Sequence, residues 1–301
     1  MQFELVVRPR ETWTRQDFLD NAVSHAIALD GMVSGGPFYD EDLRLLNCDH
    51  HDGVVREATM STAMQVFFAI KGGCAQAGFR RVYVNDPDQD TTLAVWLLRN
   101  SHLFEGIGSN PVISRLLTLN DRLDVTGGAF PMLLDDDVLS MHNWVFQPYT
   151  SARTSGALAT MSAASMATLI EAIGRRLDDL LMGRGGRAAL AGAYELLADH
   201  GWWKVIDEQG GNEARYRLYA AGMQAFVSLV ATRPDGRFVY SVGRRSRFIP
   251  FPVQRILKAL SASEPDAPWG GSDLIGGSSR AKGSALTWEQ VQDQVRFLLH
   301  K

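Results

Sequence analysis

One strand, Arg81–Val84, limits the folds open to this chain more than any other segment. Its sequence, Arg81-Val82-Tyr83-Val84, is β-branched and aromatic, which is typical of a buried strand. The polar residues 85–92 follow at once, and residues 93–100 then carry a helical pattern. A strand that runs through a short turn into a helix is the repeating unit of α/β proteins. We therefore expect an α/β fold with a parallel sheet.

Length and composition predict two domains. The chain has 301 residues, of which 46% are hydrophobic, enough for a substantial core. We expect a parallel-sheet domain with flanking helices at residues 1–150, a helical connector at 151–186 and a smaller α/β domain at 187–301. The boundary is indicated at residues 146–156, which contain proline, serine and glycine and few large apolar side chains. The Ala- and Met-rich residues 157–182 could also pair with a second copy to form a homodimer.

Hydrophobic periodicity predicts the remaining elements. An edge strand is expected at residues 3–7 and a short buried strand at 43–46. A hairpin is indicated by two apolar runs, 226–230 and 237–242, around the turn Pro234-Asp235-Gly236. Helical patterns cover residues 14–28, 57–71, 188–199, 253–262 and 287–300.

Charge and cysteine content restrict the partners and the compartment. The formal net charge is -4 and the sequence pI is about 6.0, so a long nucleic acid is not expected as a partner. Cys48 and Cys74 have no paired spacing, which favours reduced thiols in a cytoplasmic protein. No signal-peptide layout opens the sequence, and no apolar run approaches the roughly 18–20 residues of a membrane helix. A small anionic substrate remains compatible with this composition.

Residues 47–53, Asn-Cys-Asp-His-His-Asp-Gly, form the most unusual polar segment. They follow the expected strand 43–46, and α/β proteins place ligands where a strand opens into such a turn. Adjacent imidazoles and carboxylates suit a divalent metal such as Mn²⁺ or Zn²⁺. The alternative is a polar loop with two surface histidines.

Further carboxylates lie at other turns of the expected first domain. Asp86, Asp88 and Asp90 alternate between a strand and a helix, where their mutual repulsion must be relieved by a cation, a helix cap or full solvation. Three alternating carboxylates favour a bound cation over a helix cap or full solvation. Asp30 lies at the tip of the turn 28–31, and Asp124 precedes a glycine-rich turn.

A second glycine-rich segment, residues 269–284, lies near the end of the chain. Backbone N–H groups of such a loop, with Arg280 and Lys282 beside them, could hold a phosphate. A flexible loop without ligand is the alternative.

Taken together, these motifs resemble the DHH phosphoesterase superfamily. Asp49-His50-His51, followed by Ala58-Thr59-Met60-Ser61-Thr62, resembles its signature, and Asp86-Pro87-Asp88-Gln89-Asp90-Thr91 resembles its first metal motif. Asp30-Gly31 is similar to the motif of the bridging carboxylate, and residues 124–130 to the last aspartate motif. Residues 276–283 and 240–246 are similar to the loop and strand of the substrate domain that accompanies this family.

The resemblance implies a metal-dependent phosphoesterase that hydrolyses an ester or anhydride of a small nucleotide or similar compound. It implies two Mn²⁺ ions, with Mg²⁺ or Zn²⁺ as alternatives, and His51 and Asp30 as catalytic residues. The substrate would contact Gly276, Gly277, Ser278 and Arg280. The implied metal ligands are Asp30, His50, Asp86, Asp88, Asp90 and Asp124.

Three departures from the family pattern leave other functions open. The Asp-x-Asp motif follows the double histidine here, whereas the family usually has it before. Val84 and Ser278 stand where the family usually has histidine. A DHH-like module that binds a nucleotide or a metal without catalysis is therefore the alternative function. A third possibility is an unrelated α/β protein, whose acidic turns would lie far apart.

Overall fold

The structure, a computed structural model, describes residues 1–128, 136–208, 213–279 and 281–300. It confirms the predicted α/β class and separates into two compact units. The first unit comprises Met1–Val125 and Leu134–Ala188, and the second comprises Thr126–Leu133 and Ala189–Lys301. Residues 151–186, expected as a connector, contribute to the first unit, and the expected boundary at 146–156 covers the end of helix α5 (Asp136–Thr154) and the two residues after it.

The first unit is built on a five-stranded, largely parallel sheet. Its order is β1 (Glu4–Val7), β5 (Arg81–Val84), β2 (Ala26–Leu29), β4 (Leu45–Cys48) and β3 (Phe38–Asp40). All neighbours are parallel except β3 and β4. The predicted edge strand and the strand at residues 81–84 are both confirmed. Strands β5, β2 and β4 lie side by side, so their carboxyl ends share one edge of the sheet.

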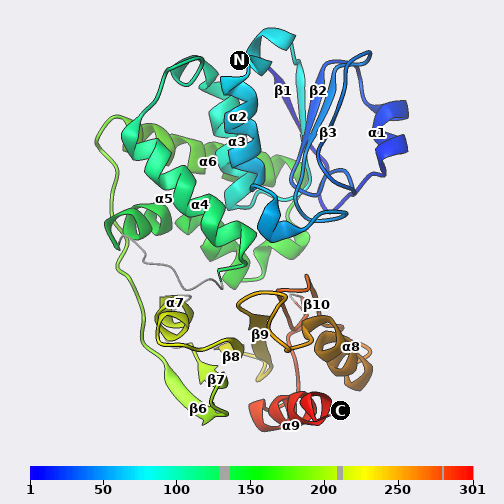
Figure 1. Cartoon of the computed structure of the whole chain (residues 1–301), viewed down its shortest axis with the longest axis vertical. Coiled ribbons are helices and arrows are strands. Elements are labelled where there is room, and N and C mark those ends of the chain that lie inside the picture. The colour runs from blue at the N-terminus through cyan, green and yellow to red at the C-terminus, as the bar shows by residue number, and fades with distance from the viewer. Residues whose placement is uncertain (129–135, 209–212, 280, 301) are drawn as a thin grey trace. The chain divides into compact units, whose positions relative to one another are not determined.

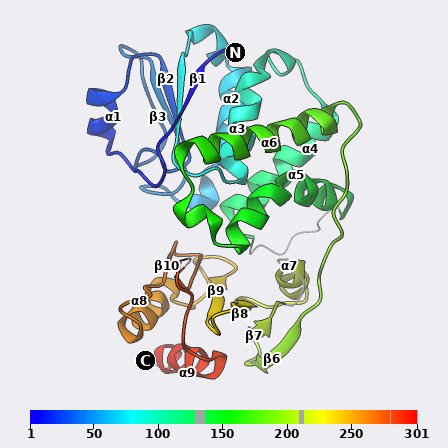
Figure 2. The ribbon, with the colours of Figure 1, turned by 180° about the vertical axis from the view of Figure 1, so that it is seen from behind.

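Helices cover both faces of this sheet (Figures 1 and 2). Helix α1 (Arg15–Asn21) covers one face, where Phe18 packs with Ala26 and Ala28. Helices α2 (Thr62–Lys71), α3 (Gln89–Arg99) and α6 (Ala163–Leu181) lie on the other, and α4 (Pro111–Val125) and α5 pack against this group. The 3₁₀ turns are η1 (Arg56–Ala58), η2 (Cys74–Ala77), η3 (Ser101–Leu103) and η4 (Ala157–Thr160).

Three expected helices differ from the structure. The prediction of a helix at 14–28 was wrong beyond Asn21, because Ala26–Leu29 forms strand β2. This strand is buried on both faces, and such a strand is apolar throughout, so its sequence does not alternate and can be mistaken for a helix. The helix at 57–71 is divided into η1 and α2, because Ser61 caps the second part through its side chain. Residues 188–199 were wrong as a helix, since strand β6 (Glu195–Asp199) pairs there with β7 (Trp203–Asp207).

The second unit contains a six-stranded mixed sheet. Its order is β10 (Gly270–Gly271), β11 (Ile275–Gly277), β9 (Phe238–Arg244), β8 (Ala225–Thr232), β7 and β6. The predicted hairpin is confirmed as β8 and β9. Helix α7 (Glu213–Ala220) connects the parallel strands β7 and β8 along the chain. Helices α8 (Val253–Ser263) and α9 (Trp288–Leu299) pack on the apolar core.

Two further features concern the chain as a whole. Cys48 is buried at the end of β4 and Cys74 is partly exposed, and neither is in a disulfide. Within the described ranges, none of the helices combines the length and the apolar character that a membrane span needs.

Close packing explains the glycines of β11. A Cβ atom on Gly277 would lie 2.3 Å from the carbonyl oxygen of Tyr240, and one on Gly276 would lie 2.4 Å from a methyl group of Leu257. A Cβ atom on Gly270, in the neighbouring strand, would meet nothing within 4 Å. These contacts require glycine at residues 276 and 277 but not at residue 270.

This contrast gives a test of the second unit. Gly277→Ala should destabilise the protein by about 1–3 kcal/mol, because the backbone of β9 cannot move aside. Gly270→Ala is the matched control and should change stability by less than about 0.5 kcal/mol. Calorimetric thermal unfolding of both variants measures the difference, and equal transition temperatures would contradict the packing argument.

Candidate metal centre

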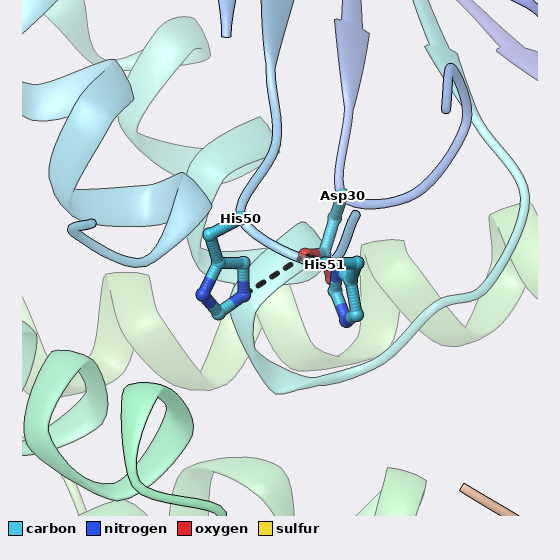
Figure 3. A group of neighbouring side chains, drawn as sticks. All are labelled: Asp30, His50 and His51. Carbon is cyan, nitrogen blue, oxygen red and sulfur yellow. Dashed lines mark ion pairs between the residues drawn. The ribbon is translucent and has the colours of Figure 1, made fainter. Parts of the chain in front are cut away.

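Strands β2 and β4 deliver the first residues of the site. Asp30 directly follows β2, and Asp49, His50 and His51 directly follow β4. The two strands are parallel and in register at Leu29 and Cys48, and the Asp30 N–H donates to the Cys48 carbonyl at 2.9 Å. Figure 3 shows both imidazoles beside the Asp30 carboxylate. The order of the strands therefore places the expected bridging aspartate next to the double histidine.

The Nε2 atom of His50 is the centre of a carboxylate cluster. It lies 2.8 Å from Asp124 Oδ2, 3.6 Å from Asp30 Oδ1 and 4.0 Å from Asp90 Oδ2. The side chains of His50, Asp30 and Asp90 are at most 2% exposed, and that of Asp124 is 24% exposed. Residues 30, 50, 90 and 124, which are distant in the sequence, thus converge on one buried point.

These distances fit ligands around an ion. In an octahedral site with bonds of about 2.1 Å, adjacent ligand atoms are about 3.0 Å apart and opposite ones about 4.2 Å. Among the described residues, His50 Nε2, Asp90 Oδ2 and Asp124 Oδ2 are buried but not aligned for a hydrogen bond. Buried polar atoms of this kind call for a partner, and a cation supplies one for all three. The cluster could therefore hold a metal ion.

A second group shares His50 with the first. Asp30, His50 and His51 also bring ligand atoms within 4.8 Å of one another. The Nδ1 atom of His51 lies 3.4 Å from Asp30 Oδ1 and 3.0 Å from Asp49 Oδ1. Asp49 is buried and also accepts the N–H groups of Gly31 and His51, so it fixes the turn that carries the histidine.

The other two predicted ligands have different surroundings. Asp88 is the N-cap of α3, where its Oδ1 accepts the Thr91 N–H at 2.8 Å. Its carboxylate interacts with Asp30, and repulsion from Asp86 also acts on it. Neither Asp86 nor Asp88 belongs to the two metal-binding groups found among the described residues.

The charge of the cluster alters several pKa values in the absence of an ion. Burial and repulsion from Asp124 and Asp30 raise the pKa of Asp90, and burial and repulsion from Asp30 and Asp86 raise that of Asp88. Burial lowers the pKa of His50, but its contacts with Asp124 and Asp30 outweigh this and raise the pKa to about 11. Without a metal, these shifts favour a proton on His50 and on the carboxyl groups of Asp88 and Asp90.

Sequence reasoning missed the groups that hold Asp30 in place. Thr62 Oγ1 donates to Asp30 Oδ1 and Thr91 Oγ1 to Asp30 Oδ2, both at 3.1 Å. Both threonines are buried in the first turns of helices, α2 and α3, whose positive ends favour a carboxylate. The caps Ser61 and Asp88 were the available signal, since they mark two helix starts next to polar turns.

Sequence reasoning also missed Arg56. Its Nη2 donates to Asp124 Oδ1 at 3.2 Å, and its side chain is 13% exposed. The side chain of His51 is 40% exposed. Burial and the charge of Arg56 lower the pKa of His51, but Asp30 and Asp49 together have the larger effect and raise it overall. Arg56, His51 and Asp124 thus form the accessible, partly cationic rim of an acidic centre.

Part of the expected phosphate loop is a strand in the structure. Gly276 and Gly277 belong to β11 in the second unit, and the Ser278 hydroxyl accepts the Tyr240 N–H at 3.0 Å. Arg280 and residues 129–130 of the last aspartate motif lie outside the described residues. Substrate contacts at residues 276–280 stay a prediction.

Comparison with known proteins gives no family for the chain. No protein-family model matches the sequence, and a search of curated proteins found no match either. The arguments that follow therefore rest on the residues of the site.

The protonated state of the cluster predicts pH-dependent metal binding. Between pH 5.5 and 8, His50 with a pKa of about 11 carries a proton that a bound ion must displace. Mn²⁺ affinity should therefore fall about tenfold for each unit that the pH is lowered. Titration calorimetry in two buffers of different ionisation enthalpy measures the protons released. Affinity that does not change with pH would show that no ligand releases a proton on binding, which contradicts a protonated His50 as a ligand.

Proposed function

We propose that this protein is a metal-dependent phosphoesterase of the DHH type. The observation that carries the proposal is the convergence of His50, Asp90 and Asp124, whose ligand atoms lie within 4.8 Å of one another, with cationic Arg56 beside them. The buried carboxylates suit divalent cations. The cationic rim of Arg56 and His51 suits an anion that would also bind to those cations. A phosphate ester or anhydride of a small nucleotide meets both requirements.

The donor set suits Mn²⁺ in particular. Carboxylate oxygens with one or two imidazole nitrogens are the ligands that Mn²⁺ accepts, and Mg²⁺ or Zn²⁺ would also fit. Asp30 and His50 would serve two ions, with Asp90 and Asp124 completing one of the sites. When bound, the ions would lower the pKa of a water molecule and polarise the phosphoryl oxygens.

The residues of the rim would orient the substrate. Asp49 engages Nδ1 of His51, which leaves Nε2 of the same ring for a phosphate oxygen. The pKa of His51 is raised, chiefly by Asp30 and Asp49 against the opposing effect of burial, so the imidazole would donate as a cation. Arg56 would fix Asp124 through one nitrogen and present its remaining positive charge to the phosphate.

A second candidate function is a DHH-like module that binds a metal or a nucleotide without hydrolysis. Val84 favours it, because this residue is fully buried in β5 at the place where the family usually has a histidine ligand. Such a module would bind Mn²⁺ at residues 30, 50, 90 and 124 and show no turnover. The two functions therefore differ in activity but share the metal.

The first test compares metal content and hydrolysis of a chromogenic phosphodiester in the same variants. His50→Ala should lose both Mn²⁺ and turnover, because it removes the residue that both groups share. His51→Ala should retain metal at the His50, Asp90 and Asp124 group but lose turnover by about 10²–10⁴-fold, since it removes a positioned proton donor. His102→Ala, an exposed histidine in η3, is the control and should change neither.

The outcomes separate the candidates. Tight Mn²⁺ binding without turnover on any ester would favour the non-hydrolytic module. An absence of bound metal in the wild-type protein would reject both and return the acidic turns to a structural role.

The role of Arg56 gives a further prediction. Arg56→Gln should raise KM for the phosphodiester by about tenfold or more, because a charged hydrogen bond to an anion contributes roughly 1.5–3 kcal/mol. Arg56→Lys should recover part of the loss, since it keeps the charge without the planar fork. Steady-state kinetics at saturating Mn²⁺ distinguish this from weakened metal binding. An unchanged KM in Arg56→Gln would assign Arg56 to Asp124 alone.

A further inference from the structure

The two oxygens of Asp90 have unequal surroundings. Oδ1 accepts the Ala63 N–H at 3.1 Å and the Asn120 side-chain amide at 2.8 Å. Oδ2 is buried, has no hydrogen bond among the described residues and lies 4.0 Å from His50 Nε2. One oxygen is therefore occupied by the protein, and the other is directed at the candidate metal position.

A third side chain supports this arrangement. His142, on α5, places Nε2 3.1 Å from Asn120 Oδ1, and its ring packs on Phe146 with centroids 4.7 Å apart. Asn120 and His142 are each only 2% exposed. The amide oxygen of Asn120 can only accept, so His142 Nε2 carries the hydrogen.

The Asp90 carboxylate fixes the direction of the Asn120 amide. Because a carboxylate oxygen accepts, the NH₂ group faces Asp90 and the amide oxygen faces His142. A flipped amide would set its oxygen against the carboxylate oxygen and leave the His142 N–H without an acceptor. The chain of donors from α5 through α4 thus ends on Oδ1 of Asp90 and keeps that atom engaged.

We propose that Asn120 and His142 are positioning residues that restrict Asp90 to single-oxygen coordination and thereby make the metal site reject Ca²⁺. The inference rests on the metal site of the proposed function. Ca²⁺ takes six to eight oxygens at about 2.3–2.6 Å and often binds both oxygens of a carboxylate. Mn²⁺ and Mg²⁺ accept one oxygen from each carboxylate in a smaller octahedral site.

The contacts of Asp30 differ from those of Asp90. Each oxygen of Asp30 accepts one threonine hydroxyl, from Thr62 on one side and Thr91 on the other. An oxygen that accepts one hydrogen bond keeps a lone pair for an ion, so Asp30 can still be a ligand. Oδ1 of Asp90, by contrast, accepts two donors, so Asp90 is the carboxylate that the protein restricts to one free oxygen.

The test measures Mn²⁺ and Ca²⁺ affinity by titration calorimetry in four variants and the wild-type protein. Asn120→Ala should weaken Mn²⁺ binding by about 10–100-fold, as loss of a supporting hydrogen bond does, and should not weaken Ca²⁺ binding. The Mn²⁺/Ca²⁺ preference should therefore fall by at least about tenfold. His142→Leu should show the same shift, and His142→Gln, which retains an N–H donor, should restore much of the preference.

Val145→Ala is the matched control. Val145 is fully buried on the same helix, so its truncation lowers stability without removing a donor from the chain. A fall in Mn²⁺/Ca²⁺ preference for the Asn120 and His142 variants but not for Val145→Ala supports the proposal. An unchanged preference in Asn120→Ala, with Mn²⁺ still bound by the wild-type protein, overturns this inference alone. Wild-type protein that binds no Mn²⁺ overturns both this inference and the proposed function.

Discussion

The repulsion among buried carboxylates is the constraint on which the first unit depends. Asp30, Asp90 and the partly buried Asp124 surround the imidazole of His50, and Asp88 is repelled by Asp30 in the same region. The first turns of two helices donate hydrogen bonds to Asp30, and a neutral amide donates to Asp90. These donors hold the carboxylates in place but carry no full charge, so protons or a cation must offset the repulsion that remains. A bound cation would displace the proton of His50 and take over that role.

The arrangement of the site follows from the order of the strands. Strands β5, β2 and β4 are adjacent and parallel, so polar residues that follow each of them must meet at one edge. Helix α4 then adds Asn120 and Asp124 from a single face, one turn apart. The acidic residues, which are far apart in the sequence, are therefore brought together by the order of the strands.

Sequence reasoning captured the local part of this structure. The strand Arg81–Val84 and the hairpin of β8 and β9 have clear patterns and clear turns, and both were placed correctly. It failed where a pattern was ambiguous, as at β2, whose four buried apolar residues suit a helix equally well. The ligand candidates Asp30, His50, Asp90 and Asp124 could be named because the short motifs around them resemble those of the DHH family. Their supporting residues could not, because Asn120 and His142 act on Asp90 across 30 or more positions and carry no local signal.

The pairing of β1 with β5 has a consequence for synthesis of the chain. Glu4 is in register with Arg81, so strand β1 has no partner in its sheet until β5 has been synthesised. Strand β2 also needs β5, and the residues that surround His50 are complete only once Asp124 has emerged. At a rate of about 5–20 residues per second, this leaves the nascent apolar strands uncovered for several seconds. During that interval the sheet of the first unit cannot yet cover these strands.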